Sequence, residues 1–538
     1  MKRLFALLLA LVMVLSLAAC GGNAGPAASP DAPAADAPAA DAPAAAAPTE
    51  ELQNVTDLKV DLSAIPEAAA YKEELVIAEN SAITSLDPHA NWSYQTNQVY
   101  RMVYDTLLTY SNGEYGPRIA TEWKWVDGTT LNVKIRDDVY FTNGEKLTAE
   151  DVAFSMDRAT YSSVTKYYDH CEVISDTELN IVLSSGCTEF LYFLADTSTA
   201  IVSKAAVEAD PEWGYVIASG PWVLDLEQFI PGDSLVMLRN DNYWGQKPNT
   251  KKFTIRIMSD NSVALMALQN GEIDFVPTIL STEVEMATAD TSIDTVTYAS
   301  SNIEYIAMNT VNGGSLTDPN LRKAVAYAID RDQIRIAAGQ DTAKLAGSMW
   351  GWASTGYYDG FDSIYSYNPE KAREYVALVE DPSFTIMVNG ATPAQKVHAQ
   401  MIQAFCADVG ITVEINETDA AGISANTKWG AATHEMLVYN ISLSDSNTSS
   451  WEFYMTNAGK NRAFCSDERV QELLVEAAAA EDNYEMYKEI QEINLKDLYY
   501  IPLYYRNITV SATKGMGGVI LRMAGGHDFT YACVPVNN

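Results

Sequence analysis

The chain has 538 residues, of which 71 are Asp or Glu and 35 are Lys or Arg, so its formal net charge is −36 at pH 7. A charge this negative argues against nucleic acid as a partner, because phosphate binding needs a basic surface, and against a surface that binds anionic lipid headgroups. The length is large for one hydrophobic core and predicts two or three compact units.

The first twenty residues predict secretion. Lys2 and Arg3 precede an uncharged apolar run at 4–17, and Leu17-Ala18-Ala19 then places small residues before Cys20. This order is typical of a secretory signal peptide, and the run is too short to span a bilayer. The cysteine after Leu-Ala-Ala resembles the lipobox of bacterial lipoproteins, where the signal is cut before a cysteine whose sulfur carries a diacylglycerol. An ordinary signal peptide with a cysteine at this place is the alternative.

The lipobox resemblance implies a signal peptide at 1–19 and a lipidated Cys20. The protein is then held on the extracellular face of the cell membrane, or in the periplasm if the cell has an outer membrane. Residues 23–48 are almost wholly Ala, Pro and Asp. Such a segment has too little apolar bulk to fold, so a disordered linker is predicted from Cys20 to residue 70.

Short strands and amphipathic helices alternate irregularly after the linker, which predicts an α/β fold. Strands are expected at 75–78 and 131–135, where apolar residues form short or alternating runs. A helix begins after Thr148, another spans 262–270 and stops at Gly271 before a strand at 273–276, and a third begins at Asp318-Pro319.

With Cys20 lipidated, five of the six cysteines remain. Cys171 and Cys187 flank two strand-like runs, 172–174 and 178–183, and such a hairpin can bring the two sulfurs together. A disulfide between them and two buried thiols are the two alternatives. No pairing for Cys406, Cys465 and Cys533 follows from the sequence.

Several motifs occur in a characteristic order. They are SLDPH at 85–89, FTNGEKLTAEDV at 141–152, SGPW at 219–222, RNDNYWG at 239–245, NGEID at 270–274, and MN at 308–309 with LRKAVAYAIDR at 321–331. Together they resemble extracellular solute-binding protein family 5, the peptide- and nickel-binding proteins of ABC importers. Within the last motif, Arg322 and Asp330 are expected to form ion pairs around a helix.

The resemblance implies a two-lobe α/β fold like that of periplasmic binding proteins (type II, cluster C), with an extra domain inserted in the first lobe. Domain I is expected at 71–113, 218–315 and 506–538, domain II at 114–217, and domain III at 316–505. The implied function is capture of a peptide between the lobes and delivery to the permease subunits of an ABC importer. A same-fold receptor for a nickel chelate, an opine or a sugar is the alternative.

The run from Val438 to Asp445 predicts a strand that ends in an acid. Peptide-binding family members carry an aspartate at the matching place, which pairs with the free amino terminus of the ligand. Leu443 and Ser444 would offer backbone groups to an extended peptide, and Asn91-Trp92-Ser93 would supply a second edge. The alternative for Asp445 is a turn or helix cap. No proline or second acid follows it, which leaves a non-peptide solute open.

The segment 348–358 is rich in aromatic residues and glycine. Trp350, Trp352 and Tyr357 suit the wall of an apolar pocket with a few polar contacts. Ordinary packing in the core is the alternative.

Catalytic motifs are missing from the sequence. It has no Gly-x-Ser-x-Gly, no phosphate-binding Gly-rich loop and no His-Glu-x-x-His, so no enzyme activity and no catalytic residues are predicted. The five histidines are scattered. We therefore expect neither a metal site nor a cofactor, and a monomer that binds its solute and its permease but no nucleic acid.

Overall fold

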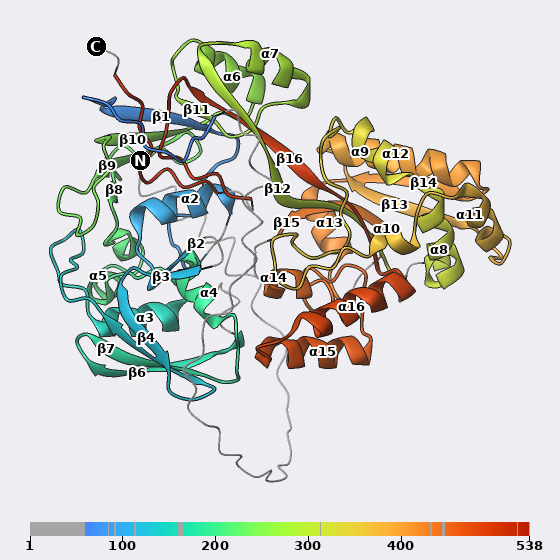
Figure 1. Cartoon of the computed structure of the whole chain (residues 1–538), viewed down its shortest axis with the longest axis horizontal. Coiled ribbons are helices and arrows are strands. Elements are labelled where there is room, and N and C mark those ends of the chain that lie inside the picture. The colour runs from blue at the N-terminus through green and yellow to red at the C-terminus, as the bar shows by residue number, and fades with distance from the viewer. Residues whose placement is uncertain are drawn as a thin grey trace, which may run out of the picture. The chain divides into compact units, whose positions relative to one another are not determined.

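The computed structural model describes residues 60–536, apart from 84, 91–92, 112–113, 160–165, 313, 431–432, 444–446 and 524–525. The predicted signal peptide, Cys20 and nearly all of the linker lie outside these residues. Within them the chain folds as mixed α/β structure around one large sheet (Figure 1).

Ten strands form the large sheet. In spatial order they are β14 (Thr412–Thr418), β13 (Ser383–Asn389), β15 (Met436–Ser442), β12 (Ile293–Met308), β16 (Tyr500–Thr513), β11 (Phe275–Val276), β1 (Glu74–Glu79), β10 (Lys252–Ile257), β9 (Ser234–Arg239) and β8 (Trp222–Leu224). The two longest, β12 and β16, pair antiparallel and join the strands on either side of them. Figure 1 shows them running from α6 and α7 toward β13 and β15.

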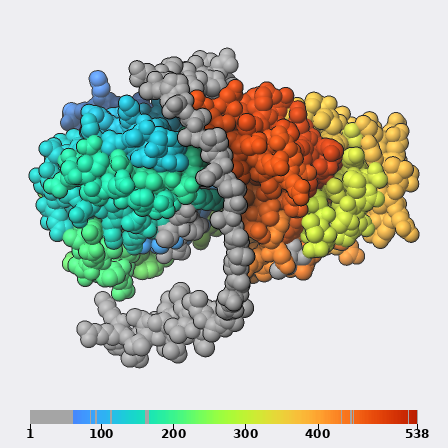
Figure 2. Space-filling view, turned by 90° about the horizontal axis from the view of Figure 1, so that it is seen from below, coloured from blue at the N-terminus to red at the C-terminus, as the bar shows by residue number. Residues whose placement is uncertain are grey.

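Two smaller sheets lie between β1 and β8 in the chain. One has four strands in the order β4 (Ala120–Trp125), β5 (Thr130–Ile135), β7 (Glu178–Leu183) and β6 (Tyr168–Ser175), and the other pairs β2 (Leu108–Ser111) with β3 (Glu114–Pro117). On the face seen in Figure 2, these cyan and green residues and the yellow to orange residues of the later chain occupy opposite sides.

The helices complete the fold. They are α2 (Tyr94–Val103), α3 (Ala149–Arg158), α4 (Phe190–Ala195), α5 (Lys204–Ala209), α6 (Asn261–Gln269), α7 (Val284–Ala289), α8 (Pro319–Ala328), α9 (Arg331–Ala337), α10 (Phe361–Ile364), α11 (Pro369–Val376), α12 (Pro393–Asp408), α13 (Ala420–Asn426), α14 (Asn447–Trp451), α15 (Glu468–Ala479) and α16 (Tyr484–Asp497). No helix of the described part of the chain has the length and apolarity that crossing a membrane requires.

The predicted strands and helices are confirmed, except at two strand ends. β11 covers only the second half of the strand expected at 273–276, and β15 ends at Ser442, before the acid at which the predicted strand ends. β1 and β5 begin within one residue of the expected strands, and α3 begins directly after Thr148, whose backbone N–H donates to Asp151 Oδ2 at 2.9 Å. Asp318 caps α8 by accepting from the N–H of Asn320 at 2.8 Å. The predicted three-domain division stays a prediction.

The SLDPH motif joins the start of the fold to α3. The two terminal guanidinium nitrogens of Arg158 each donate to the Asp87 carboxylate at 2.6 Å. Buried His89 donates from Nε2 to the carbonyl of Ala200 at 2.7 Å. Burial lowers the pKa of His89 to about 4. The ring is therefore neutral at pH 7 and acts as a hydrogen-bonding part of the core.

Neither Arg322 nor Asp330 forms the expected ion pair with any residue that the structure describes. Arg322 donates to the backbone carbonyls of Leu316 and Asp497, each at 2.8 Å. The Asp330 carboxylate caps α9 by accepting from the backbone N–H of Gln333 at 3.0 Å. Both side chains satisfy backbone groups at helix ends, which a charge pattern alone does not reveal.

Cys171 and Cys187 are free thiols. Of the two alternatives, the disulfide is therefore wrong and the pair of thiols is right. Cys171 in β6 stands opposite Ile181 in β7. Ile181 lies six positions before Cys187, so the two cysteines are not opposite each other in the hairpin. Cys187 lies beyond the end of β7, buried at the turn into α4. Burial raises the pKa of both thiols to about 12, which makes them unreactive at neutral pH.

Candidate functional site

The pairing of β12 with β16 is interrupted near the middle of the sheet. Ala299 pairs with Asn507 and Ile303 with Tyr505, so the three β12 residues 300–302 stand opposite the single residue Arg506. We call residues 300–302 the β12 bulge. A bulge of this kind turns backbone groups and side chains away from the regular ladder, often beside a binding site.

Backbone groups of the β12 bulge bind three other segments. The Ser301 N–H donates to the carbonyl of Met523 at 3.0 Å, and the Ser301 carbonyl accepts from the N–H of Leu443 at 3.1 Å. The Ser300 carbonyl accepts from the indole N–H of Trp352 at 3.0 Å. Leu443 and Trp352, which the sequence predicts at the site, therefore meet at this bulge.

The start of α2 reaches the same place. Ser442 and Asn302 hydrogen-bond the hydroxyl of Tyr94, whose pKa is raised by burial. The Asn302 side-chain amide donates to Ser442 Oγ at 3.0 Å. Segments near residues 94, 300, 352 and 443 are thus brought together, although they lie far apart in the sequence.

Asn91, Trp92, Ser444 and Asp445 lie outside the described residues, so their predicted roles stay predictions. Their neighbours are described. Ser93 is the N-cap of α2, and its hydroxyl accepts from the N–H of Thr96 at 3.1 Å. The Ser93 side chain therefore caps a helix, and the predicted role of this segment as a second edge for the ligand stays a prediction. Leu443 is fully buried, and its backbone rather than its side chain joins the bulge.

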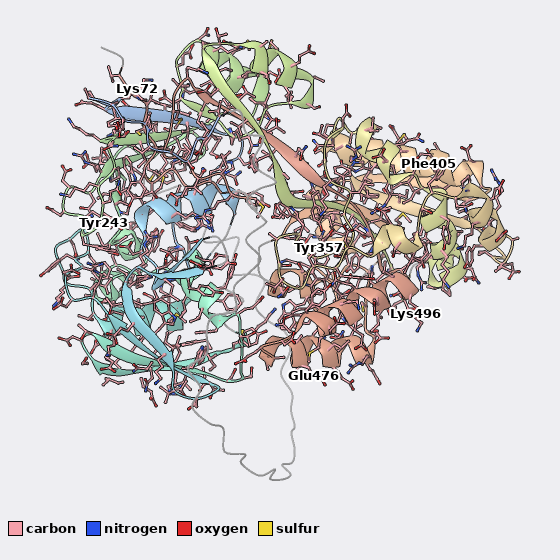
Figure 3. The ribbon with its side chains drawn as sticks, in the orientation of Figure 1. Lys72, Tyr243, Tyr357, Phe405, Glu476 and Lys496 are labelled. Carbon is pink, nitrogen blue, oxygen red and sulfur yellow. The ribbon has the colours of Figure 1, made fainter. Side chains whose placement is uncertain are left out.

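The aromatic segment 348–358 divides into core and partly exposed residues. Trp350 is fully buried and stacks on Tyr454, with ring centroids 5.8 Å apart. Trp350 therefore packs in the core and does not line a pocket wall as predicted. Trp352 and Tyr357 are only partly buried, and Tyr357 lies near the crossing of β12 and β16, edge-on to Tyr505 (Figure 3).

Sequence reasoning missed Asn447. Its side-chain oxygen accepts from the indole N–H of Trp350 at 3.0 Å and from the N–H of Gly356 at 2.9 Å. Its own N–H donates to Glu189 at 2.9 Å. These bonds fix the chain two residues after Asp445 against both the aromatic segment and the residue before α4. The sequence does not single out Asn447, because it lies in a run of similar small polar residues.

Glu304 is a fully buried carboxyl four residues before the end of β12. The side-chain amide of Asn440 donates to its Oε1 at 3.2 Å, and Arg506 Nε lies 3.7 Å from the same oxygen. His398 Nδ1 lies 3.6 Å from Oε2, and the other ring nitrogen of His398 is 2.8 Å from the hydroxyl of Tyr504. Burial raises the pKa of Glu304 to about 7 and lowers that of His398 to about 3.

We expect Glu304→Gln to change how stability depends on pH. In the folded protein the carboxyl of Glu304 has a pKa of about 7, whereas in the unfolded chain it has the ordinary value of 4.5. Deprotonation therefore favours the unfolded chain, and the folded protein loses stability as pH rises from 4.5 toward 7. The free energy of unfolding of the variant, relative to the wild type, should therefore rise by about 2–3 kcal/mol between pH 5 and pH 8. Urea denaturation at a series of pH values measures this difference.

Exposed Glu417, which pairs with Lys396 at 3.3 Å, provides the control. The curve of Glu417→Gln should run parallel to that of the wild type. Parallel curves for Glu304→Gln and the wild type would contradict a buried, proton-retaining Glu304.

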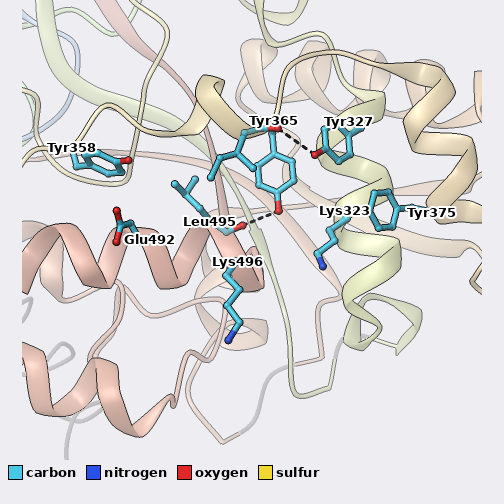
Figure 4. Close-up of a pocket in the computed structure, with 9 residues that line it drawn as sticks. Lys323, Tyr327, Tyr358, Tyr365, Tyr375, Glu492, Leu495 and Lys496 are labelled. Atoms are coloured by element: carbon cyan, nitrogen blue, oxygen red, sulfur yellow. Dashed lines mark hydrogen bonds between the residues drawn. The ribbon is translucent and has the colours of Figure 1, made fainter.

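A surface pocket of about 460 Å³ lies elsewhere, among α8, α10, α11 and α16 (Figure 4). Two of its four tyrosine hydroxyls are occupied, because Tyr365 donates to the carbonyl of Leu495 at 2.8 Å and Tyr327 to that of Ile364 at 3.2 Å. Among the residues that the structure describes, no group of three His, Cys, Asp or Glu side chains could hold a metal ion. The junction at the β12 bulge is therefore the candidate site.

Known proteins resemble the chain along most of its length. Glutathione-binding protein GsiB of Escherichia coli K12 is 25% identical over 511 residues, which cover 88% of this chain and 96% of GsiB. The structure of DppA from Helicobacter pylori in complex with the peptide STSA superposes with a TM-score of 0.73 at 23% identity, covering 87% of this chain and 99% of DppA. NikA from Staphylococcus aureus in complex with Ni(L-His)2 gives 0.71 at 17% identity, covering 86% and 100%.

These likenesses confirm the predicted two-lobe α/β fold of periplasmic binding proteins. The family model of bacterial extracellular solute-binding proteins, family 5 (middle part), matches residues 114–464, well over half of the chain. The chain therefore belongs to family 5 of the bacterial extracellular solute-binding proteins.

Proposed function

We propose that the protein captures a peptide beside the β12 bulge and delivers it to the permease subunits of an ABC importer. The observation that supports this most is the meeting of α2, the end of β15 and the aromatic segment around Ser300–Asn302. Strand-derived backbone and one aromatic wall suit an extended peptide, whose main chain is common to all sequences.

Asp445 would bind the amino terminus of the peptide. It lies two residues after Leu443, whose N–H is held by the bulge, and two before Asn447, whose side chain is fixed by three residues of the aromatic segment. Anchors on both sides restrict where a carboxylate between them can lie. A restricted carboxylate selects an ammonium group and sets the register of the peptide.

Binding without turnover is the result that tests this function. We expect calorimetric titration with short peptides of mixed sequence to show saturable binding at a ratio of one to one, and mass spectrometry to recover the peptides intact. Steady cleavage would instead indicate an enzyme. Binding of a nickel chelate, an opine or a sugar, with no binding of any peptide, would support the alternative class of solute.

The same proposal places the protein on the extracellular face of the membrane as a monomer, held by a lipid on Cys20. Replacing Cys20 with Ser removes the sulfur that the lipid needs, so we expect the variant to leave the membrane fraction and appear in the medium or periplasm. Fractionation followed by immunoblotting measures this. A Cys20→Ser protein that still sediments with membranes would contradict the lipid anchor.

A further inference from the structure

One face of α2 connects the candidate site to an arginine. Tyr94, which bonds Ser442 and Asn302 at the site, and Arg101 are seven residues apart and so project from the same side of the helix. The rise between them is about 10 Å. This equals about three residues of an extended peptide.

A second arginine reaches this face from the C-terminal loop. Met523 accepts from the N–H of Ser301 in the β12 bulge, and the adjacent Arg522 donates its backbone N–H to His527 Nδ1 at 3.3 Å. The same loop packs against α2, because a methyl group on Gly526 would lie 3.1 Å from the carbonyl of Tyr94. Arg522 therefore lies between the bulge and α2.

Each of the two guanidinium groups has one nitrogen without a hydrogen-bond partner among the described residues. Arg101 Nε and Arg522 Nε are buried with no acceptor, and the nearby Asn97 Oδ1 on α2 is buried with no donor. Arg522 is 3.8 Å from Asp528, which is beyond hydrogen-bonding distance. Arg101 forms no ion pair with a described residue, although Asp196 and Asp528 attract it.

The two carboxylates near this pair also accept hydrogen bonds from backbone groups. Asp196 accepts from the N–H of Ser198 at 2.9 Å, and Asp528 accepts from the N–H of Thr530 at 2.9 Å. Arg522 repels Arg101, and together with burial this lowers the pKa of Arg101 to about 10. The two guanidinium groups are partly exposed, so a ligand can reach them. They repel each other, and each keeps one buried N–H without an acceptor, which favours a further anionic acceptor beside them.

We propose that Arg101 and Arg522 bind a carboxylate of the captured peptide. The inference rests on the proposed function and adds a preference for acidic ligand ends. Guanidinium groups offer paired donors that match the two oxygens of a carboxylate. In a chain with a net charge of −36, such a pair gives an anionic group a local positive site.

Calorimetry with three matched tripeptides tests this proposal. They are Ala-Ala-Ala as the free acid, the same peptide as its C-terminal amide, and the amide of Ala-Ala-Asp. The wild type should bind the free acid about 10- to 100-fold more tightly than the plain amide, as expected for hydrogen bonds to a charged group. Rescue by the aspartate amide would identify a side-chain carboxylate as sufficient, and its failure would assign the site to the C-terminus.

The preference should disappear in Arg101→Gln/Arg522→Gln and persist in part in the doubly Lys-substituted protein, which keeps both charges. Arg373→Gln, on the exposed side of α11, is the control and should bind like the wild type. Equal affinity of the wild type for free acid and amide, or a preference kept by the double Gln variant, overturns the proposal.

The two proposals fail in different ways. A wild type that binds none of the tripeptides contradicts the peptide function. The arginine pair is then tested with glutarate, a non-peptide dicarboxylate. Glutarate binding that the double Gln variant loses would support the carboxylate site, and no glutarate binding would overturn it.

Discussion

Replacing Asp105 with Ala is expected to lower the free energy of unfolding by about 3–5 kcal/mol, the typical cost of removing one partner of a buried ion pair. Asp105 is fully buried and accepts four side-chain hydrogen bonds. The donors are Arg118 Nε at 2.6 Å, Ser219 Oγ at 2.9 Å, Trp244 Nε1 at 3.0 Å and the Tyr243 hydroxyl at 3.2 Å. Without the carboxylate, Arg118 becomes a largely buried cation that has lost its direct ion pair.

Urea denaturation followed by circular dichroism measures the loss. Asp241→Ala is the matched control, since its carboxylate is 73% exposed and pairs with Arg239 at 2.8 Å. Exposed pairs contribute about 0–1 kcal/mol, so the control should unfold close to the wild type. A loss below about 1 kcal/mol for Asp105→Ala, against the cost typical of buried pairs, would contradict the central place of this carboxylate in the fold.

Replacing Asp445 with Asn is expected to weaken peptide binding about 10- to 150-fold. The substitution keeps the size of the side chain and removes its charge, and a hydrogen bond to a charged group contributes about 1.5–3 kcal/mol. Acetylating the amino terminus of the peptide should weaken binding to the wild type by a similar factor. Acetylation should have little further effect on the variant, because the same contact is already lost.

Titration calorimetry with free and acetylated peptides gives the four affinities of this cycle. Asn416→Ala, in β14 away from the β12 bulge, serves as a control with unchanged affinity. If the wild type binds free and acetylated peptides equally, Asp445 does not hold an amino group, and a non-peptide solute becomes the better assignment.

The sequence predicts the fold well because the elements have local signals. Thr148 and Asp318 mark helix starts through their caps, and apolar runs mark β1 and β5. The motifs are informative for a related reason. Ser219 and Trp244 come from two separate motifs, yet both bind Asp105, which belongs to neither. Their order therefore identifies the family, while their roles appear only when the chain is folded.

The candidate site is less predictable, since its bonds depend on tertiary contacts. At the β12 bulge three residues of β12 stand opposite one residue of β16, which no local pattern shows. Trp350 and Trp352 look alike in the sequence, but only Trp350 is enclosed in the core. Arg101 lies on a helix whose charge pattern is ordinary, and the missing acceptor of its Nε–H is visible only in three dimensions.

Native mass spectrometry of the protein purified without denaturation tests the central claim most directly. If the protein captures peptides, the spectrum should show, besides the mature chain, complexes heavier by the masses of short peptides. Fragmentation of the released ligands should give amino-acid residue masses. A bound solute without peptide bonds, or an empty protein that also binds no peptide from a mixed library, would contradict the account.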